Sequence, residues 1–271
     1  MYLLNSLNTM RRPNLDNVAH LVQFIRQKHH QIEVERKFVP TSHFLENWKL
    51  LLNRHDTLHS TGTEKANVPA QELELHDVYY ECNDRLWRKG IWVRFRTCTP
   101  FQDPKPRSGI WNAKLRLNGN FANSRMMEVH GEQEVKDLLR THAPEVAMSD
   151  LTMYADLITT RRSWKVPNLF LGYQCELDWE MNLVLDTVMT SQSGTFGCGS
   201  SVFRHEVGEI ELTKETSLDL AHVSHAREAE KMDAYLARFI GEHPSLFDCC
   251  RDATGKLEAF TRWKSGNPLR S

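Results

Sequence analysis

Charged side chains recur at every second position in several segments of this sequence. In residues 31–39, Glu33, Glu35 and Lys37 alternate with apolar or mixed residues. Successive side chains of a β-strand point to opposite faces, so these three charges share one face of a strand. A period of two over this length favours a strand, and the chain must then accommodate one strongly charged strand face.

The same alternation occurs in four later segments. Their shared faces carry Trp92, Arg94 and Arg96; Asn112, Lys114 and Arg116; Thr159, Arg161, Ser163 and Lys165; and Val207, Glu209, Glu211 and Thr213. One such strand is typical of a solvated sheet face. Repetition of the pattern favours a barrel, in which apolar faces pack against outer helices and charged faces meet in the lumen. Charges buried there require mutual pairing and a bound ligand, because isolated buried charges are too costly.

Strands dominate the expected secondary structure. We predict strands at residues 31–39, 77–82, 91–98, 110–117, 125–130, 157–166 and 207–213, and a hairpin formed by residues 173–179 and 182–187. Helices are predicted at about 42–54, 132–141, 218–242 and 256–263. Many strands with few long helices between them indicate an α+β protein built on an antiparallel sheet or barrel with peripheral helices. Residues 1–30 are expected to form a helical N-terminal extension, and residues 31–271 one domain.

Composition narrows the possible partners and location. The formal net charge is −1, so no global basic field attracts nucleic acid, and an anion site must be a local concentration of Lys and Arg. The six cysteines lack CxxC spacing, which favours reduced thiols. No apolar run reaches the roughly 20 residues of a membrane span. We expect a cytoplasmic monomer that binds neither nucleic acid nor membrane, with a mitochondrial location as the alternative because residues 1–30 are basic.

The charged faces indicate the chemistry of the ligand. Clustered carboxylates suit Mg²⁺ or Mn²⁺, and four acids fall on these faces: Glu33, Glu35, Glu209 and Glu211. Lysine and arginine suit phosphate oxygens, and the bases are Lys37, Arg94, Arg96, Lys114 and Arg161. A metal-chelated polyphosphate satisfies both sets together.

An ordered series of short motifs accompanies these faces. They are the ExExK segment 32–38, residues 77–80, 92–96 and 111–114, Arg161 with 164–165, residues 186–187, 208–211 and 255–257. In this order they resemble the CYTH, or triphosphate tunnel metalloenzyme, superfamily, and within it most closely the thiamine triphosphatases. The resemblance spans residues 31 to about 263.

The resemblance implies a tunnel of eight antiparallel strands with helices outside. It implies Mg²⁺-dependent hydrolysis of the terminal phosphate of a triphosphate, most specifically of thiamine triphosphate to the diphosphate, with Mn²⁺ as the alternative ion. The acids matching its metal ligands are Glu33, Glu35, Asp186, Glu209 and Glu211. The bases matching its phosphate ligands are Lys37, Arg94, Arg96, Lys114, Arg161 and Lys256.

Two residues have alternative roles. Lys37, beside the catalytic acids Glu33 and Glu35, either positions or deprotonates the attacking water or clamps a phosphate. Trp92 shares a face with two arginines, and it either stacks on a cationic thiazolium or pyrimidine or packs as part of the tunnel wall.

The sequence departs from the family pattern at two places. Val184 stands where the pattern has an acid, and the loop 190–204 is longer than usual. Other activities therefore stay open: an inorganic triphosphatase, an adenylate cyclase, a lyase acting on a diphosphate-bearing substrate, or a non-catalytic polyphosphate-binding module.

Overall fold

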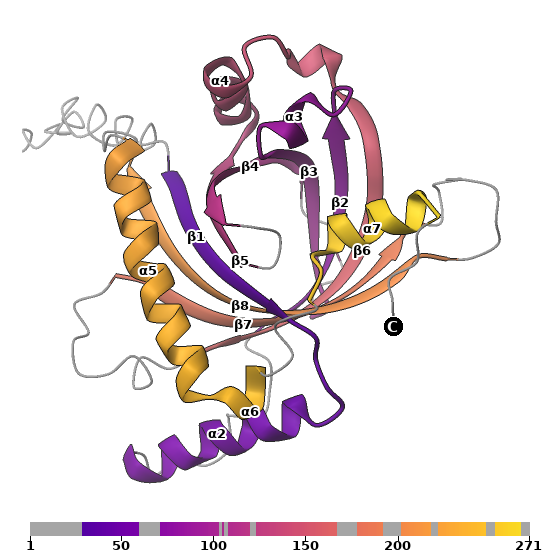
Figure 1. Ribbon diagram of the computed structural model, residues 1–271. Helices are drawn as coiled ribbons and strands as arrows, with labels where there is room; N and C mark the ends of the chain where they lie inside the picture. Colours follow the sequence, from indigo (N-terminus) through magenta and orange to yellow (C-terminus); the bar gives the residue numbers. More distant parts are fainter. Residues whose placement is uncertain are drawn as a thin grey trace, which may run out of the picture.

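A closed barrel of eight antiparallel strands forms the body of the molecule (Figure 1). The computed structural model describes residues 29–59, 71–102, 105, 108–119, 123–166, 178–191, 202–217, 222–247 and 253–266. Around the barrel the strands follow the order β1-β5-β4-β3-β2-β6-β7-β8. The strands are β1 His29–Phe38, β2 Gln71–Glu81, β3 Ile91–Pro100, β4 Ile110–Gly119, β5 Asn123–His130, β6 Thr152–Lys165, β7 Glu180–Thr190 and β8 Arg204–Ser217. The predicted antiparallel barrel with peripheral helices is confirmed.

The predicted hairpin of residues 173–179 and 182–187 is wrong. One edge of β7 pairs with β6 and the other with β8, so no edge is left for a ninth strand. Residues 173–177 lie outside the described part of the chain, as does most of the loop 190–204. Strand β1 already begins at His29, and residues 1–28 of the expected N-terminal extension also lie outside it.

Two groups of helices cover the outer face of the barrel (Figure 1). Helices α2 (Phe44–His59), α5 (His222–Glu242) and α6 (Pro244–Phe247) share one hydrophobic cluster with β1, β7 and β8. Helices α3 (Arg85–Arg88) and α4 (Glu132–His142) share a second cluster with β3, β4 and β5. The apolar positions of the alternating strands, such as Val34, Ile210 and Val93, are fully buried in these clusters. Their burial turns the charged positions into the barrel.

Helix α7 (Lys256–Lys264) has a different place. Its Ala259 and Phe260 pack against Tyr79, Leu157 and Val188. Leu157 alternates with the outward Ile158, and Val188 shares its face with Asp186, so these are inner-face positions. Helix α7 therefore closes part of one end of the barrel. Among the described helices, none is long and apolar enough to span a membrane.

A glycine is required directly before one of the predicted acids. A Cβ on Gly208 would lie 2.3 Å from the ring of Phe38, whose side chain is fully buried. The ring of Phe38 also packs against that of Phe44 of α2, with ring centroids 4.6 Å apart and a tilt of 32°. The missing side chain thus lets β1, β8 and α2 close tightly beside Glu209.

Candidate functional site

The inner faces of the strands enclose a cavity of about 620 Å³. The cross-strand register sets Glu35 opposite Glu211 and places Lys114 between Trp92 and Glu128. The predicted site residues that line the cavity are Glu33, Glu35, Lys37, Trp92, Arg94, Arg96, Lys114, Arg161, Glu209, Glu211 and Lys256. A cavity of this size accommodates a small organic ligand.

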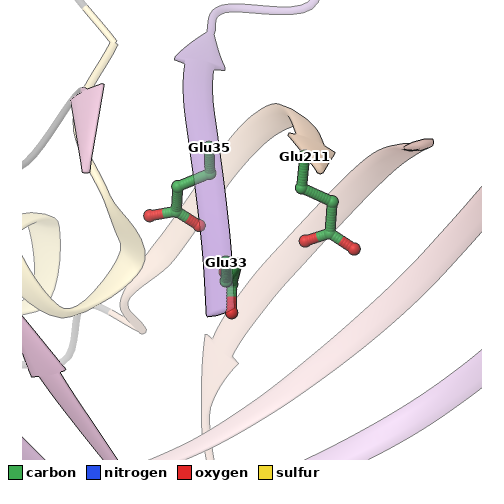
Figure 2. Close-up of side chains that lie close together, drawn as sticks. All are labelled: Glu33, Glu35 and Glu211. Atoms are coloured by element: carbon green, nitrogen blue, oxygen red, sulfur yellow. The ribbon is translucent and has the colours of Figure 1, made fainter. Parts of the chain in front are cut away.

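Three carboxylates converge on one side of the cavity. Glu33 and Glu35 project from β1, and Glu211 projects from the neighbouring strand β8 (Figure 2). One oxygen of each lies within 4.8 Å of the others, a spacing at which a single ion can contact all three. Glu209 lies one inward position along β8, near Lys37 and Arg161 at 3.4 and 3.6 Å.

Burial and neighbouring charges shift the pKa values of these acids. Burial raises the pKa of Glu33 well above its ordinary value, although Lys114 opposes the shift. Burial also raises the pKa of Glu211 to about 7, with a further contribution from Glu209. Glu35 differs, because burial would raise its pKa but Lys37 and Lys114 lower it well below the ordinary value. A hard divalent cation fits this set of oxygen donors, because it would favour the ionised forms of Glu33 and Glu211 beside Glu35.

Two lysines border the acid cluster. Lys114 Nζ donates to both oxygens of Glu33, at 2.7 and 2.6 Å. Lys37 pairs with Glu35, which also accepts a 2.6 Å hydrogen bond from the buried Ser124 hydroxyl. Burial opposes the charge of Lys37, but Glu35 and Glu209 more than offset it and raise the pKa of this lysine. Lys37 is therefore a cation in this structure, which favours the phosphate clamp over the base among its two predicted roles.

Arginines form the facing side of the cavity, each held by a carboxylate. Arg96 binds Asp77 through two hydrogen bonds of 2.6 and 2.7 Å, and Arg94 donates to Glu128 at 2.7 Å. Burial alone would raise the pKa of Glu128, but Lys114 and Arg94 lower it to about 2. These forks are fixed before any ligand arrives, a property that favours recognition of phosphate oxygens.

Asp186 lies apart from the acid cluster. Arg161 binds both of its oxygens, at 2.8 and 2.6 Å, and Asp186 does not line the cavity. Its role as a metal ligand stays a prediction, and the structure places it as the partner of an arginine. Val184 precedes it by two residues on the same inner face, opposite Glu209 and with 1% exposure.

Lys256 reaches the cavity from the first turn of α7. Its Nζ lies 3.6 Å from an oxygen of Asp77 and 3.6 Å from one of Asp186. The ammonium is buried and makes no hydrogen bond within the described residues. Buried polar groups are usually satisfied, so an ammonium that lines the cavity without a hydrogen bond is available to a ligand there.

The sequence alone assigned no role to two acids in this arrangement. Asp77 lies in a quoted motif, yet its pairing with Arg96 depends on the β2–β3 register. Glu128 shares a face with Met126 and His130 in a predicted strand, and the alternation applied to the other strands would have placed it inside. With both included, seven acids of this network face six bases, and Glu258, an eighth acid that lines the cavity, pairs with Arg262 at 2.5 Å. The site is therefore formally close to neutral when empty.

The comparison with protein families identifies the domain. The model of the CYTH domain matches residues 31–236, most of the chain. The chain belongs to the CYTH family. No curated protein matches the sequence.

Solved structures resemble this CYTH protein only distantly. HpAC1 from Hippeastrum, described as an adenylyl cyclase candidate with a dominant triphosphatase activity, is 15% identical with a TM-score of 0.42, over 88% of this chain and 97% of that one. PH1819 from Pyrococcus horikoshii OT3 is 15% identical with a TM-score of 0.40, over 76% and 89%. An adenylate cyclase candidate from Vibrio parahaemolyticus is 13% identical with a TM-score of 0.36, over 85% and 98%. The family assignment rests on the domain match.

Proposed function

We propose that this CYTH protein hydrolyses the terminal phosphate of a triphosphate with a divalent cation, and that the substrate is thiamine triphosphate. The observation that carries the proposal is the division of one buried cavity into an acid cluster and a facing set of bases. Neither half alone specifies the ligand. A phosphate chain that chelates a cation complements both halves together.

Charge balance supports a cation as part of the ligand. The empty site is nearly neutral, so a triphosphate of about −4 would leave a large uncompensated charge in a buried space. Each divalent ion neutralises about two of these negative charges. Glu33, Glu35 and Glu211 would hold the first ion, and Glu209 lies next to them for a second. Mg²⁺ is proposed because every donor is a carboxylate oxygen.

The cation supplies charge neutralisation and a more acidic water. The remaining steps belong to the protein. Arg94, Arg96 and Lys256 would orient the phosphate chain and stabilise charge on the leaving oxygens. Lys37, a buried cation paired with Glu35, would bind the terminal phosphate beside the acids. Burial of the phosphate chain in the cavity excludes bulk water and strengthens its electrostatic interactions with these side chains.

The organic group is assigned to the wall around Trp92. This ring lines the cavity next to Lys114, and the guanidinium of Arg116 lies 4.8 Å from its centroid. Trp87 and Leu257 line the same cavity. An aromatic surface beside the phosphate-binding bases fits a flat heterocycle attached to the triphosphate.

Replacing Trp92 by alanine distinguishes the contribution of the organic group to turnover from that of the phosphate chain. We expect kcat/KM for thiamine triphosphate to fall about 5- to 30-fold, the equivalent of a stacking contact of about 1–2 kcal/mol. Turnover of inorganic triphosphate should change by less than about twofold, because it has no ring to stack. Equal losses on both substrates would assign Trp92 to the wall alone.

Cation binding is expected to depend on pH. Ligand carboxyls must be ionised to bind a metal, and burial holds the pKa of Glu211 at about 7 in the unliganded protein. The affinity for Mn²⁺ should therefore rise from about pH 6 to about pH 8, and protons should be released on binding. Titration calorimetry in buffers of different ionisation enthalpy measures this release. Zero release at about pH 6.5 would contradict the assignment.

A panel of substrates tests the activity itself. Thiamine triphosphate, ATP and inorganic triphosphate are each incubated with Mg²⁺ or Mn²⁺, and released phosphate and cyclic AMP are measured. We expect phosphate release with thiamine triphosphate fastest. Preference for inorganic triphosphate would refute the thiamine assignment, cyclic AMP formation would identify a cyclase, and ligand binding without turnover would identify a binding module.

A further inference from the structure

We propose that Asp233, on the outer helix α5, is a positioning residue that holds Glu35 in place through the barrel wall. The proposal rests on the proposed function, because it takes Glu35 to be a cation ligand. Asp233 itself lies on the opposite side of the wall from the cavity, and its ion-pair partners among the described residues are Arg36 and Arg125. Two separate chains of contacts lead from its carboxylate to Glu35.

The first chain of contacts passes through Arg36. Asp233 Oδ1 accepts from Nη2 of Arg36, the outward residue directly after Glu35 on β1. Nη1 of the same guanidinium donates to the main-chain carbonyl of Glu35 at 3.3 Å. Asp233 thus fixes the guanidinium that contacts the backbone of Glu35.

The second chain of contacts passes through the neighbouring strand. Asp233 Oδ2 accepts from Nη2 of Arg125 at 2.5 Å, and Arg125 follows Ser124 on β5. Ser124 lies directly opposite Glu35 in the ladder, and its hydroxyl donates to Glu35 Oε1 at 2.6 Å. One carboxylate on α5 therefore reaches the backbone of Glu35 along one chain of contacts and its carboxylate along the other.

The environment makes this clamp strong. The side chains of Arg36, Asp233 and Arg125 are only 15%, 16% and 23% exposed. Without the carboxylate, two guanidinium groups on adjacent strands would face each other with little solvent between them. Helix α5 is itself fixed, because Met232, next to Asp233, is fully buried in the core cluster of the barrel wall. Because α5 is fixed in place, its contacts through Asp233 restrict the position of Glu35 in the acid cluster.

The test is the affinity of the full-length protein for Mn²⁺ in the Asp233→Asn variant, measured by electron paramagnetic resonance. We expect the dissociation constant to rise about tenfold, at the lower end of the effects seen when partners of metal ligands are removed. Glu228→Gln is the matched control. Glu228 lies on the same helix and accepts from Lys214 of β8 at 2.9 Å, and within the described part of the chain no hydrogen bond or ion pair joins Glu228 or Lys214 to Glu35.

Both substitutions remove a largely buried carboxylate of α5 that pairs with the barrel, Asp233 with Arg36 and Arg125 and Glu228 with Lys214, so both should lower the melting temperature. Only Asp233→Asn should weaken Mn²⁺ binding, which a merely structural role would not explain. Equal Mn²⁺ affinity in the two variants would overturn the clamp. Absence of Mn²⁺ binding in the wild-type protein would overturn the metal site and this proposal together.

A second variant covers the case in which Asp233→Asn fails to fold. Arg125→Gln keeps the pair between Arg36 and Asp233 and removes only the contacts through β5. We expect it to fold and to weaken Mn²⁺ binding several-fold. Wild-type affinity in this variant would overturn the chain of contacts through Ser124.

Discussion

Replacement of Glu211 by glutamine is expected to abolish metal-dependent phosphate release while the unliganded protein becomes more stable at alkaline pH. Glu211 is one of three carboxylates close enough to share an ion, and glutamine is nearly isosteric but uncharged. Loss of one ligand charge in a buried cation site should lower kcat by about 10³-fold or more, the scale of removing a group that stabilises the transition state. Phosphate release measured with saturating Mg²⁺ gives the result.

The gain in stability follows from the protonation of Glu211. Burial raises the pKa of this carboxyl to about 7 in the fold, above its ordinary value of 4.5. The native state therefore binds this proton more tightly than the unfolded chain, and stability is lost as the pH rises from about 4.5 through 7. Glutamine cannot ionise, so Glu211→Gln should exceed wild type in melting temperature at about pH 8, and the difference should vanish near pH 4.

Glu206→Gln is the matched control on the same strand. Glu206 points outward, pairs with Arg204 at 2.9 Å and is 55% exposed, so its substitution should change neither turnover nor pH dependence. Wild-type turnover in Glu211→Gln would refute the metal site. A lower melting temperature than wild type at pH 8 would instead show that Glu211 is held as a carboxylate by the bases of the cavity.

The barrel follows from local sequence, whereas its strand count does not. Alternation identified β1, β3, β4 and β8 because the central part of each strand has a mainly apolar outer face and a charged inner face, although Arg36 interrupts the outer face of β1. Strand β2 is longer than expected, since Gln71–Glu74 are largely exposed and lack that contrast. The ninth strand arose because residues 173–179 also alternate, and only the pairing of both edges of β7 excludes it from that hairpin.

The site illustrates a similar limit. Alternation assigns a residue to the lumen, but the register decides its partner. Arg161 was expected to bind phosphate and Asp186 to bind metal, and the β6–β7 register sets them opposite each other. The inward position of Glu128, by contrast, could have been predicted from the alternation of side chains along its strand alone. Asp233 shows what no inner-face rule detects, because its contribution crosses the wall from a helix nearly two hundred residues along the chain from Arg36.

Replacement of Lys256 by methionine is expected to weaken triphosphate binding about 10- to 100-fold without changing the affinity for Mn²⁺. The buried ammonium has no hydrogen-bond partner in the described residues, so its three donors are available to a phosphate. A hydrogen bond to a charged group contributes about 1.5–3 kcal/mol, which corresponds to this loss. Lys256 lies beside Asp77 and Asp186, outside the cluster of three acids, so metal binding should be unaffected.

Methionine preserves most of the packing of the lysine stem, and the two aspartates keep their arginine partners, so helix α7 should stay docked. Lys264→Met is the control, because Lys264 lies at the opposite, exposed end of the same helix and donates to the Tyr154 carbonyl at 3.1 Å. Calorimetric titration with inorganic triphosphate compares the two variants. Equal affinity of the two variants for triphosphate would show that Lys256 serves only to join Asp77 and Asp186. A gain in Mn²⁺ affinity in Lys256→Met would instead support Asp186 as a metal ligand, because the lysine would then have competed with the ion for that carboxylate.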